Sequence, residues 1–378
     1  MDKKTKILVV YTGGTIGSVR YVTKEGKVIK GQPKDILKLY PEAKDYFKSS
    51  TAVTLLCDNF FKKYPGYKNE VNFDNKLDLE VLSENMSIDI WNKLIQCLRK
   101  YNFSDYDGII ITHGTDTLGY TANLLAMLYS NIQVPMFLVS SNDSLDSENA
   151  NGIYNFKGAI DFIKNEGTPG VYVTYADKDK IKVFYGSRII QCKQLVDDFD
   201  AINENGYAPL GTMTLDGKFM PNNFELLKKI KFDKKEEPLI TIDNLKVNAN
   251  IIKIAPYVGL NYDNFSIFNC NAVMHTCYHS GTSCTIGKGE NSILEFIRMC
   301  STMGVDFFYG PIYGEEGKAM YETTHAVMKA GANVIKNISE ENAWVKLLLA
   351  YSKYNDINSI VNYINKDINN EHVYVKKR

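Results

Sequence analysis

The chain has 378 residues, more than the roughly 150 of a typical domain, so two domains are expected. Lys plus Arg and Asp plus Glu both total 44, so the chain lacks the basic excess typical of proteins that bind nucleic acid or anionic membranes. No apolar run reaches the roughly 18 residues needed to cross a membrane. Seven scattered cysteines, an odd number, are typical of reduced thiols and favour a cytoplasmic location.

Short apolar runs alternate with longer amphipathic segments, which is typical of an α/β protein with a mostly parallel sheet. We expect these elements to form a larger N-terminal domain of the flavodoxin-like or Rossmann-like class. Its expected strands are 7–11, 53–57, 108–112, 134–140 and 170–175. Its expected helices begin after Ser87, which has the character of an N-cap, after strand 108–112, and at residue 151.

A charged, proline-bounded stretch at 217–238 predicts a linker between an N-terminal catalytic domain, 1–216, and a smaller C-terminal α/β domain, 239–378. The second domain is expected to contain strands 251–254, 272–276 and 306–309 and helices after Ser292, Met320 and Glu340. The polar, glycine-containing segment 18–31 predicts a mobile flap.

Two turns with threonine hydroxyls follow expected strands. The first, Thr12-Gly13-Gly14-Thr15-Ile16, has adjacent glycines that let a substrate approach the backbone closely. The second, His113-Gly114-Thr115-Asp116-Thr117, adds a carboxylate. Ligands bind beyond the carboxyl ends of strands in open parallel sheets, so neighbouring strands would bring both turns to one site. Taken singly, the first is also explained as a plain strand-to-helix turn and the second as an N-cap.

Together the two turns resemble the signatures of the bacterial-type L-asparaginase/glutaminase family, and the similarity is clearest over residues 6–205. The resemblance implies hydrolysis of L-asparagine to L-aspartate and ammonia through an acyl-enzyme on Thr15, with Thr115, Asp116 and a lysine forming a Thr–Asp–Lys chain. It also implies that Gly14 and Gly114 line the substrate site, that no metal or organic cofactor is needed, and that the protein is a homodimer or homotetramer.

The position of the family lysine depends on the direction of counting. Counting back from Phe199-Asp200-Ala201 gives Lys193, whereas counting forward from Gly186-Ser187-Arg188 gives Gln191. We expect Lys193 to be the catalytic lysine, because an amine can relay a proton and a neutral amide cannot. Its amine should then lie within hydrogen-bond reach of Thr115 or Asp116.

A further segment, Ser83-Glu84-Asn85, resembles the family loop that holds the substrate α-carboxylate and α-ammonium. Ser83 matches the serine for the carboxylate, and Glu84 replaces the usual Gln or Ser. Other departures from the family pattern are Lys27 in place of the flap tyrosine, with Tyr21 as a possible substitute, Ser140-Ser141-Asn142 after the fourth strand, and the turn Tyr278-His279-Ser280-Gly281-Thr282.

Other possible functional sites in the sequence have weaker support than this resemblance. A zinc site formed by Cys270, His275, Cys277, His279 and Cys284 lacks the usual ligand spacing, so core packing is expected instead. His113 is expected to shape its turn, and 59–64 is expected to be a packed loop with no role in nucleic-acid binding. A Rossmann oxidoreductase would require Gly-x-Gly-x-x-Gly, which the first turn lacks.

The remaining alternatives are a glutaminase-asparaginase of broader specificity and a non-catalytic amino-acid sensor on the same scaffold. One methylene separates L-asparagine from L-glutamine, which is worth only ~1–3 kcal/mol of discrimination. The transamidating members among the family's wider relatives carry an extra N-terminal domain, for which the early first strand is expected to leave no room.

Overall fold

The computed structural model describes residues 3–45, 52–177, 180–233, 236–287, 289–314 and 320–374. The chain divides into two compact units. Unit 1 comprises Met1–Ala201 and Ala208–Asp243, and unit 2 comprises Ile202–Tyr207 and Asn244–Arg378. No helix in these described ranges is both long and apolar enough to cross a membrane.

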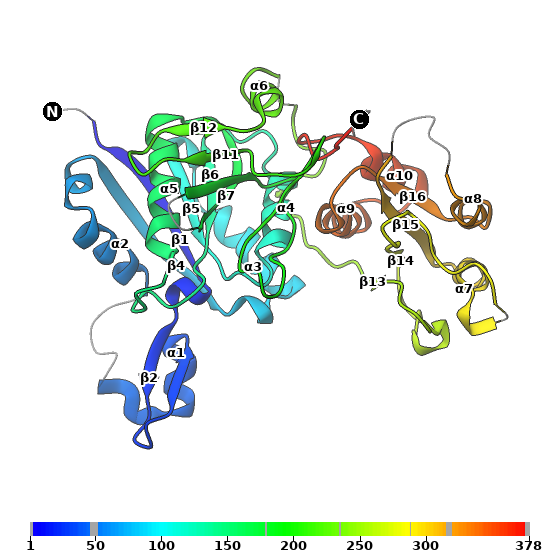
Figure 1. Ribbon diagram of the computed structural model, residues 1–378, viewed down its shortest axis with the longest axis horizontal. Coiled ribbons are helices and arrows are strands. Elements are labelled where there is room, and N and C mark those ends of the chain that lie inside the picture. The colour runs from blue at the N-terminus through cyan, green and yellow to red at the C-terminus, as the bar shows by residue number, and fades with distance from the viewer. Residues whose placement is uncertain are drawn as a thin grey trace. The chain divides into compact units, whose positions relative to one another are not determined.

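Unit 1 is built on an eight-stranded sheet with the strand order β12-β11-β8-β7-β6-β5-β1-β4 among the described residues (Figure 1). The strands from β4 to β7 in this order are parallel, and β8, β11 and β12 extend the sheet by antiparallel pairing. Their bounds are β1 Thr5–Gly13, β4 Val71–Val81, β5 Gly108–Thr112, β6 Pro135–Val139, β7 Gly170–Asp177, β8 Lys180–Tyr185, β11 Gly211–Met213 and β12 Phe219–Pro221.

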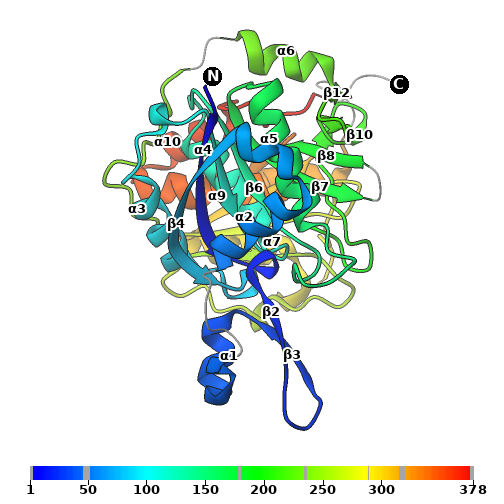
Figure 2. The same ribbon diagram turned by 90° about the vertical axis from the view of Figure 1, so that its left-hand side faces the viewer.

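Helices cover both faces of this sheet (Figures 1 and 2). Helices α2 (Ala52–Lys63) and α5 (Gly152–Asn165) lie on one face, and α3 (Ile88–Leu98) and α4 (Leu118–Leu128) lie on the other. Burial on both faces explains why the central strands are continuous apolar runs, as in the fully buried Ile7–Tyr11 segment. The expected parallel-sheet class of this domain is confirmed.

The predicted strand 53–57 is wrong, because these residues belong to helix α2. A short apolar run does not by itself distinguish a strand from a buried helix. Here Leu56 and Phe60, four residues apart on one helical stripe, are both fully buried, and Phe60 packs edge-on against Phe156 at a centroid distance of 5.4 Å. The segment 59–64 is therefore packed as expected, but most of it is helix rather than loop. The place beside β1 at the edge of the sheet is taken by β4, in which apolar and polar residues alternate as is typical of an edge strand.

The predicted linker, 217–238, contains strand β12 and helix α6 (Phe224–Phe232), both of which belong to unit 1. Leu226, Leu227 and Ile230 of α6 are buried, whereas the charged residues within this helix are exposed. Unit 2 begins at Asn244 and also includes a short hairpin of β9 (Ile202–Asn203) and β10 (Gly206–Tyr207).

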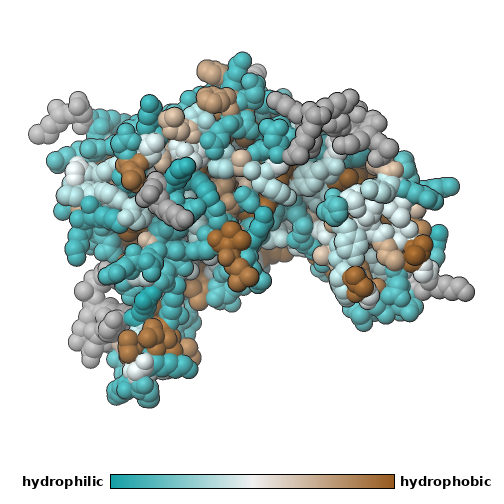
Figure 3. Space-filling view, in the orientation of Figure 1, coloured by the Kyte–Doolittle hydropathy of each residue, from teal (hydrophilic) through white to brown (hydrophobic). Residues whose placement is uncertain are grey.

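The expected flap forms an antiparallel hairpin of β2 (Val19–Val22) and β3 (Val28–Gly31), followed by α1 (Pro33–Leu39) (Figure 2). The hairpin leaves the sheet directly after the turn that ends β1. Apolar side chains gather on this part of the surface in Figure 3, where Val22, Val28 and Leu39 are each more than half exposed.

Unit 2 is a smaller α/β unit, as expected. Its four described parallel strands follow the order β13-β14-β15-β16: Ile251–Ile254, Ala272–His275, Asp306–Ile312 and Asn333–Lys336. Its helices are α7 Ile293–Thr302, α8 Glu322–Lys329, α9 Glu340–Lys353 and α10 Ile357–Asn365. A separate core of strand and α7 residues, including Val273, Phe296 and Phe307, stabilises this unit.

Candidate active site

The two threonine turns lie at the carboxyl ends of neighbouring strands. Strands β1 and β5 pair in parallel, with Val10 opposite Ile111. Just beyond that register, the Thr12 N–H donates to Thr112 Oγ1 at 3.1 Å, and the Thr12 hydroxyl donates to the Thr112 carbonyl. The strands are therefore tied together where the two turns begin, and the expectation that they are neighbours is confirmed.

The turns touch through their glycines. A Cβ atom added to Gly14, whose φ is +82°, would lie 2.3 Å from the Gly114 nitrogen. A Cβ atom added to Gly114 would lie 2.3 Å from Ser83 Oγ. Only residues without side chains allow this approach, and the positive φ of Gly14 adds a backbone requirement that favours glycine. Three segments that are distant in sequence therefore meet at one edge of the sheet.

Ser83 connects the second turn to the end of β4. Its hydroxyl donates to Asp116 Oδ2 at 2.9 Å and accepts from the Asp116 N–H at 3.2 Å. The Thr117 hydroxyl donates to the Ser83 carbonyl at 2.9 Å. Ser83 is buried, whereas Asp116 and the adjacent Glu84 are exposed. The structure thus brings Ser83 and Asp116 into one hydrogen-bonded pair beside Gly114.

Thr15 and Thr115 are half-buried, each directly after one of the touching glycines. Thr15 opens a single 3₁₀ turn, Thr15–Gly17. Within the described ranges of the chain, neither side-chain hydroxyl has a hydrogen bond to protein. Each therefore retains its full hydrogen-bonding capacity for a ligand at this edge.

The predicted contact of Lys193 with the second turn is replaced by a contact of Gln191. The Gln191 amide donates to the Asp116 carbonyl, and its oxygen accepts from the Gly119 N–H at 3.0 Å, at the start of α4. The amine of Lys193, a residue whose side chain is 53% exposed, donates to Asp200 Oδ2 at 3.0 Å. These contacts favour the register counted forward from Gly186-Ser187-Arg188.

The loop between these counting points explains the difference. Ile190 and Asp200 are joined by a backbone hydrogen bond of 2.9 Å, so the loop ends are fixed. Between them, Leu195 and Asp197 have positive φ values of 68° and 47°. Positive φ values are uncommon outside glycine, and here they mark a loop that bulges after Gln191. A bulge at this place has room for the two residues by which the two counts differ.

His113 is buried at the start of the second turn, with Nδ1 2.7 Å from the Gly114 carbonyl oxygen. Burial lowers the pKa of His113 to about 4, although the contact with the Gly114 carbonyl opposes this shift. The imidazole is therefore neutral near pH 7 and fits the expected role of shaping the turn.

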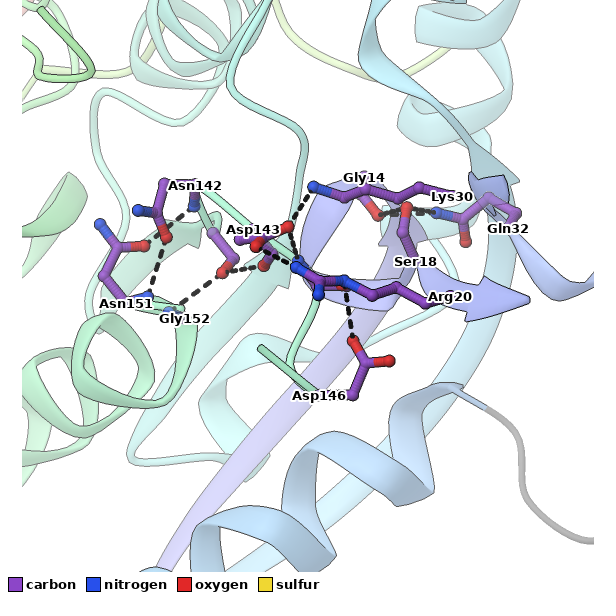
Figure 4. Close-up of polar contacts among 12 residues, drawn as sticks. Gly14, Ser18, Arg20, Lys30, Gln32, Asn142, Asp143, Asp146, Asn151 and Gly152 are labelled. Atoms are coloured by element: carbon purple, nitrogen blue, oxygen red, sulfur yellow. Dashed lines mark hydrogen bonds and ion pairs between the residues drawn. The ribbon is translucent and has the colours of Figure 1, made fainter. Parts of the chain in front are cut away.

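Sequence analysis missed Gln32, which lies between the hairpin and α1 and is 0% exposed. Its amide nitrogen donates to the Gly14 carbonyl, so Gln32 contacts the backbone of the first turn (Figure 4). The only sequence signal was a polar residue between Gly31 and Pro33, which is not specific. Its burial depends on the long-range position of the hairpin.

Three of the residues considered as zinc ligands each contact a different protein group. His275 Nε2 lies 2.9 Å from the Tyr262 hydroxyl, and Cys277 Sγ lies 3.3 Å from the Pro311 carbonyl. Cys284 Sγ lies 3.1 Å from the Ile286 carbonyl. Among the residues that the structure describes, no group of three or more His, Cys, Asp or Glu side chains is arranged to hold a metal ion.

Amidotransferase subunits from two archaea are similar to this chain in sequence. A glutamyl-tRNA(Gln) amidotransferase subunit from Saccharolobus solfataricus is 25% identical over 305 residues, which cover 78% of this chain and 66% of the relative. The corresponding protein from Thermococcus kodakarensis is 24% identical over 316 residues, covering 80% and 67%. The chain thus spans about two thirds of the length of these relatives.

Solved structures of L-asparaginases share the fold. The thermostable L-asparaginase from Thermococcus kodakarensis matches with a TM-score of 0.71 at 22% identity, covering 99% of this chain and 100% of that one. The probable cytoplasmic L-asparaginase from Campylobacter jejuni matches with a TM-score of 0.69 at 20% identity, covering 96% and 100%. The sequence model of the family described as "Asparaginase, N-terminal" matches residues 6–223, more than half of the chain, and includes every segment of the site above. This chain belongs to the asparaginase family.

Proposed function

We propose that this protein is an amidohydrolase that converts L-asparagine to L-aspartate and ammonia through an acyl-enzyme on Thr15. The contact between Gly14 and Gly114 carries the proposal, because it brings two threonine turns to one edge of the sheet. Membership in the asparaginase family supports amide hydrolysis as the chemistry, and the resemblance of the two turns to the family signatures suggests the residues.

In the proposed reaction, the Thr15 hydroxyl oxygen attacks the side-chain amide carbon of the substrate. The hydroxyl proton passes through the site to the amide nitrogen, the carbon–nitrogen bond breaks, and ammonia leaves. Water then hydrolyses the aspartyl ester and restores the Thr15 hydroxyl. Because a threonine hydroxyl is a weak nucleophile, a neighbouring group must accept its proton. Backbone N–H groups of the glycine-rich turns would stabilise the oxyanion of each tetrahedral intermediate.

The other site residues have supporting roles in the proposal. Thr115 and Asp116 would complete the catalytic group, and Gly14 and Gly114 would line the substrate site. Ser83 would bind the substrate α-carboxylate by turning its hydroxyl from Asp116 to the substrate, and the exposed Glu84 would pair with the α-ammonium. No metal or organic cofactor takes part in the proposed reaction.

The contact of Gln191 with Asp116 favours a second candidate function, an amino-acid sensor that binds asparagine without hydrolysing it. A neutral amide cannot accept a proton at the position where the resemblance implies a lysine. In the hydrolase proposal, Asp116 must supply this capacity instead, since the Lys193 amine bonds to Asp200. A glutamine at this position would therefore lower the rate of hydrolysis and leave the binding of asparagine largely unchanged.

The proposal also covers a second substrate, the cellular location and the oligomeric state. L-Glutamine is proposed as a second, weaker substrate. The protein is proposed to act in the cytoplasm as a homodimer or homotetramer, since symmetric association is the default for soluble oligomers. The cysteine content and the name of the Campylobacter jejuni structure support the location.

Steady-state ammonia release from L-asparagine and from L-glutamine tests the proposal, with calorimetric binding of both amino acids measured in parallel. The relatives are named as parts of a glutamyl-tRNA(Gln) amidotransferase, so the assay omits tRNA and reports on this chain alone. Catalytic ammonia release from L-asparagine supports the hydrolase. Binding without ammonia release supports the sensor, and neither binding nor release contradicts both.

A further inference from the structure

We propose that Gln32 is a positioning residue that fixes the peptide between Gly14 and Thr15 and thereby aims the Thr15 turn at the substrate. The kinetic part of this inference rests on the proposed function. Its structural part concerns the turn itself and is tested separately below.

All three polar positions of the buried Gln32 amide are used. Its nitrogen donates to the Gly14 carbonyl at 2.6 Å and to Ser18 Oγ at 3.1 Å (Figure 4). Its oxygen accepts from the Tyr11 hydroxyl at 3.1 Å. These partners allow one orientation of the amide, since exchanging its oxygen and nitrogen would set acceptor against acceptor at Gly14. A fully satisfied buried network of this kind rigidifies the segments that it joins.

The network determines the direction of the Gly14 carbonyl. This oxygen also accepts from the Gly17 N–H at 3.0 Å and from the Ser18 hydroxyl at 3.3 Å. In a trans peptide the carbonyl and the following N–H point in opposite directions. The Thr15 N–H therefore points away from Gln32, and it has no acceptor within the described chain. An N–H left open beside the nucleophile suits the stabilisation of an oxyanion.

The amide of Gln32 serves the turn and not the helix that follows it. Gln32 occupies the N-cap position of α1, but its side chain makes no capping hydrogen bond there. Gly14, with φ 82° and ψ 179°, adopts this backbone conformation without strain, but a glycine has many other conformations open to it, so outside contacts are what hold it in this one. Three of the hydrogen bonds that hold this peptide end on its carbonyl, and Gln32 makes the shortest of them.

A cluster of charges anchors the hairpin that carries Gln32. Arg20 and Lys30 lie opposite each other on β2 and β3, and Asp143 accepts from both at 2.5 Å (Figure 4). Arg20 also donates to Ser144 Oγ at 3.2 Å. A second carboxylate of the loop after β6, Asp146 Oδ1, lies 3.9 Å from Arg20 Nε, so two carboxylates balance the two cations of the hairpin (Figure 4). These contacts fix the strand that leads into Gln32.

The test compares Gln32→Met with Gln133→Met, which makes the same change at an exposed glutamine of unit 1. We expect Gln32→Met to lower kcat by about 10- to 100-fold with little change in KM, because a misplacement of about 1 Å at a reacting group costs on this order. We also expect at least about tenfold faster hydrogen exchange at the Gly17 and Ser18 amides, whose acceptors lie in the turn. Gln133→Met should leave both quantities unchanged. The conservative variant Gln32→Glu, which cannot donate to the Gly14 carbonyl, should not restore kcat.

The two readouts separate the two claims. A wild-type protein that releases no ammonia contradicts the proposed function, and the exchange rates then decide the role of Gln32 alone. Unchanged exchange at Gly17 and Ser18 in Gln32→Met overturns the inference, as does a kcat within twofold of wild type. A thermal unfolding scan of each variant identifies a folded sample. If Gln32→Met does not fold, Tyr11→Phe, which removes one partner of the amide, takes its place with the same expectations at reduced size.

Discussion

The two units share a parallel α/β construction, but the hydroxyl groups at the strand ends of unit 1 differ in their partners from those in the core of unit 2. In unit 1, Thr15 and Thr115 follow β1 and β5 and have no hydrogen bond to protein within the described residues. In unit 2, the Tyr309 hydroxyl lies 3.2 Å from the Gly281 carbonyl and 3.0 Å from Ser283 Oγ, and the Thr324 hydroxyl donates to the same carbonyl at 2.8 Å. Hydroxyls that are satisfied internally stabilise a fold, whereas those left open are available to a ligand.

The carboxylate at the site in unit 1 contrasts with a buried ion pair in unit 2. Asp116 of unit 1 is exposed at the edge of the sheet. In unit 2, Lys346 and Glu371 are 0% exposed and pair at 2.6 Å. Lys346 also donates to the Lys366 carbonyl at 2.6 Å, and Glu371 accepts from the Asn369 N–H at 2.7 Å. The buried pair joins α9 to the chain after α10, so its role is structural.

The largest expected effect is on the open hydroxyl of the second turn. Thr115→Ala should lower the turnover of L-asparagine at least about 1,000-fold while the protein stays folded, because removing one member of a catalytic unit costs nearly as much as removing several. Thr302→Ala, on an exposed part of α7, is the matched control. Steady-state ammonia release measures both, and near wild-type turnover in Thr115→Ala would show that this threonine is not catalytic.

The buried pair of unit 2 should affect stability instead. Lys346→Met leaves Glu371 buried without its cation, and breaking such a pair costs about 3–5 kcal/mol of unfolding free energy. Lys193→Met removes a pair in which the lysine side chain is 53% exposed, so the expected loss is only about 0–1 kcal/mol. Chemical denaturation measures the difference. Equal losses in the two variants would mean that Lys346 and Glu371 do not form a desolvated pair.

Each unit also buries a histidine at a strand end, and both should make stability depend on pH. Burial lowers the pKa of His113 and of His275 to about 4, against a usual value of 6.5. Between these two values the unfolded chain binds a proton that the folded chain does not. Stability should therefore fall as pH drops from about 6.5 to about 4, by about 1.4 kcal/mol per pH unit for each histidine.

The variant His275→Gln isolates one of these contributions. Its unfolding free energy should depend less steeply on pH over this range, with His325→Gln, on an exposed part of α8, as the control for the substitution itself. Denaturation curves at several pH values give the slopes. A slope equal to that of the wild type would indicate that His275 is protonated equally in the folded and unfolded states.

The smallest expected change in activity comes from substituting Gln191 or Lys193, the two candidates for the lysine position. Gln191→Met removes hydrogen bonds to the backbone of Asp116 and Gly119, each worth about 0.5–1.5 kcal/mol, so activity should fall by about tenfold. Lys193→Met should change activity less than twofold, because its amine bonds to Asp200. Ammonia assays of both variants provide the comparison. The reverse ranking would restore Lys193 as the proton acceptor and the register counted back from Phe199.

The sequence predicts those features that short-range patterns determine. The turns around Thr15 and Thr115 were found because each follows a continuous apolar strand, and the positions of most parallel strands follow from the same pattern. Helix α2 was missed because its apolar run fits either structure until Phe60 is packed against Phe156. The place of Gln191 and the burial of Gln32 depend on where a loop bulges and where a hairpin folds back. Neither feature has a local sequence pattern.

The role of the open Thr15 hydroxyl as nucleophile is tested by ammonia release from L-asparagine with Thr15→Ala and Thr15→Ser beside the wild type. We expect Thr15→Ala to lose nearly all turnover and Thr15→Ser to retain a measurable part of it, with both variants unfolding at the wild-type temperature. Turnover by Thr15→Ala close to that of the wild type would show that another group attacks the amide.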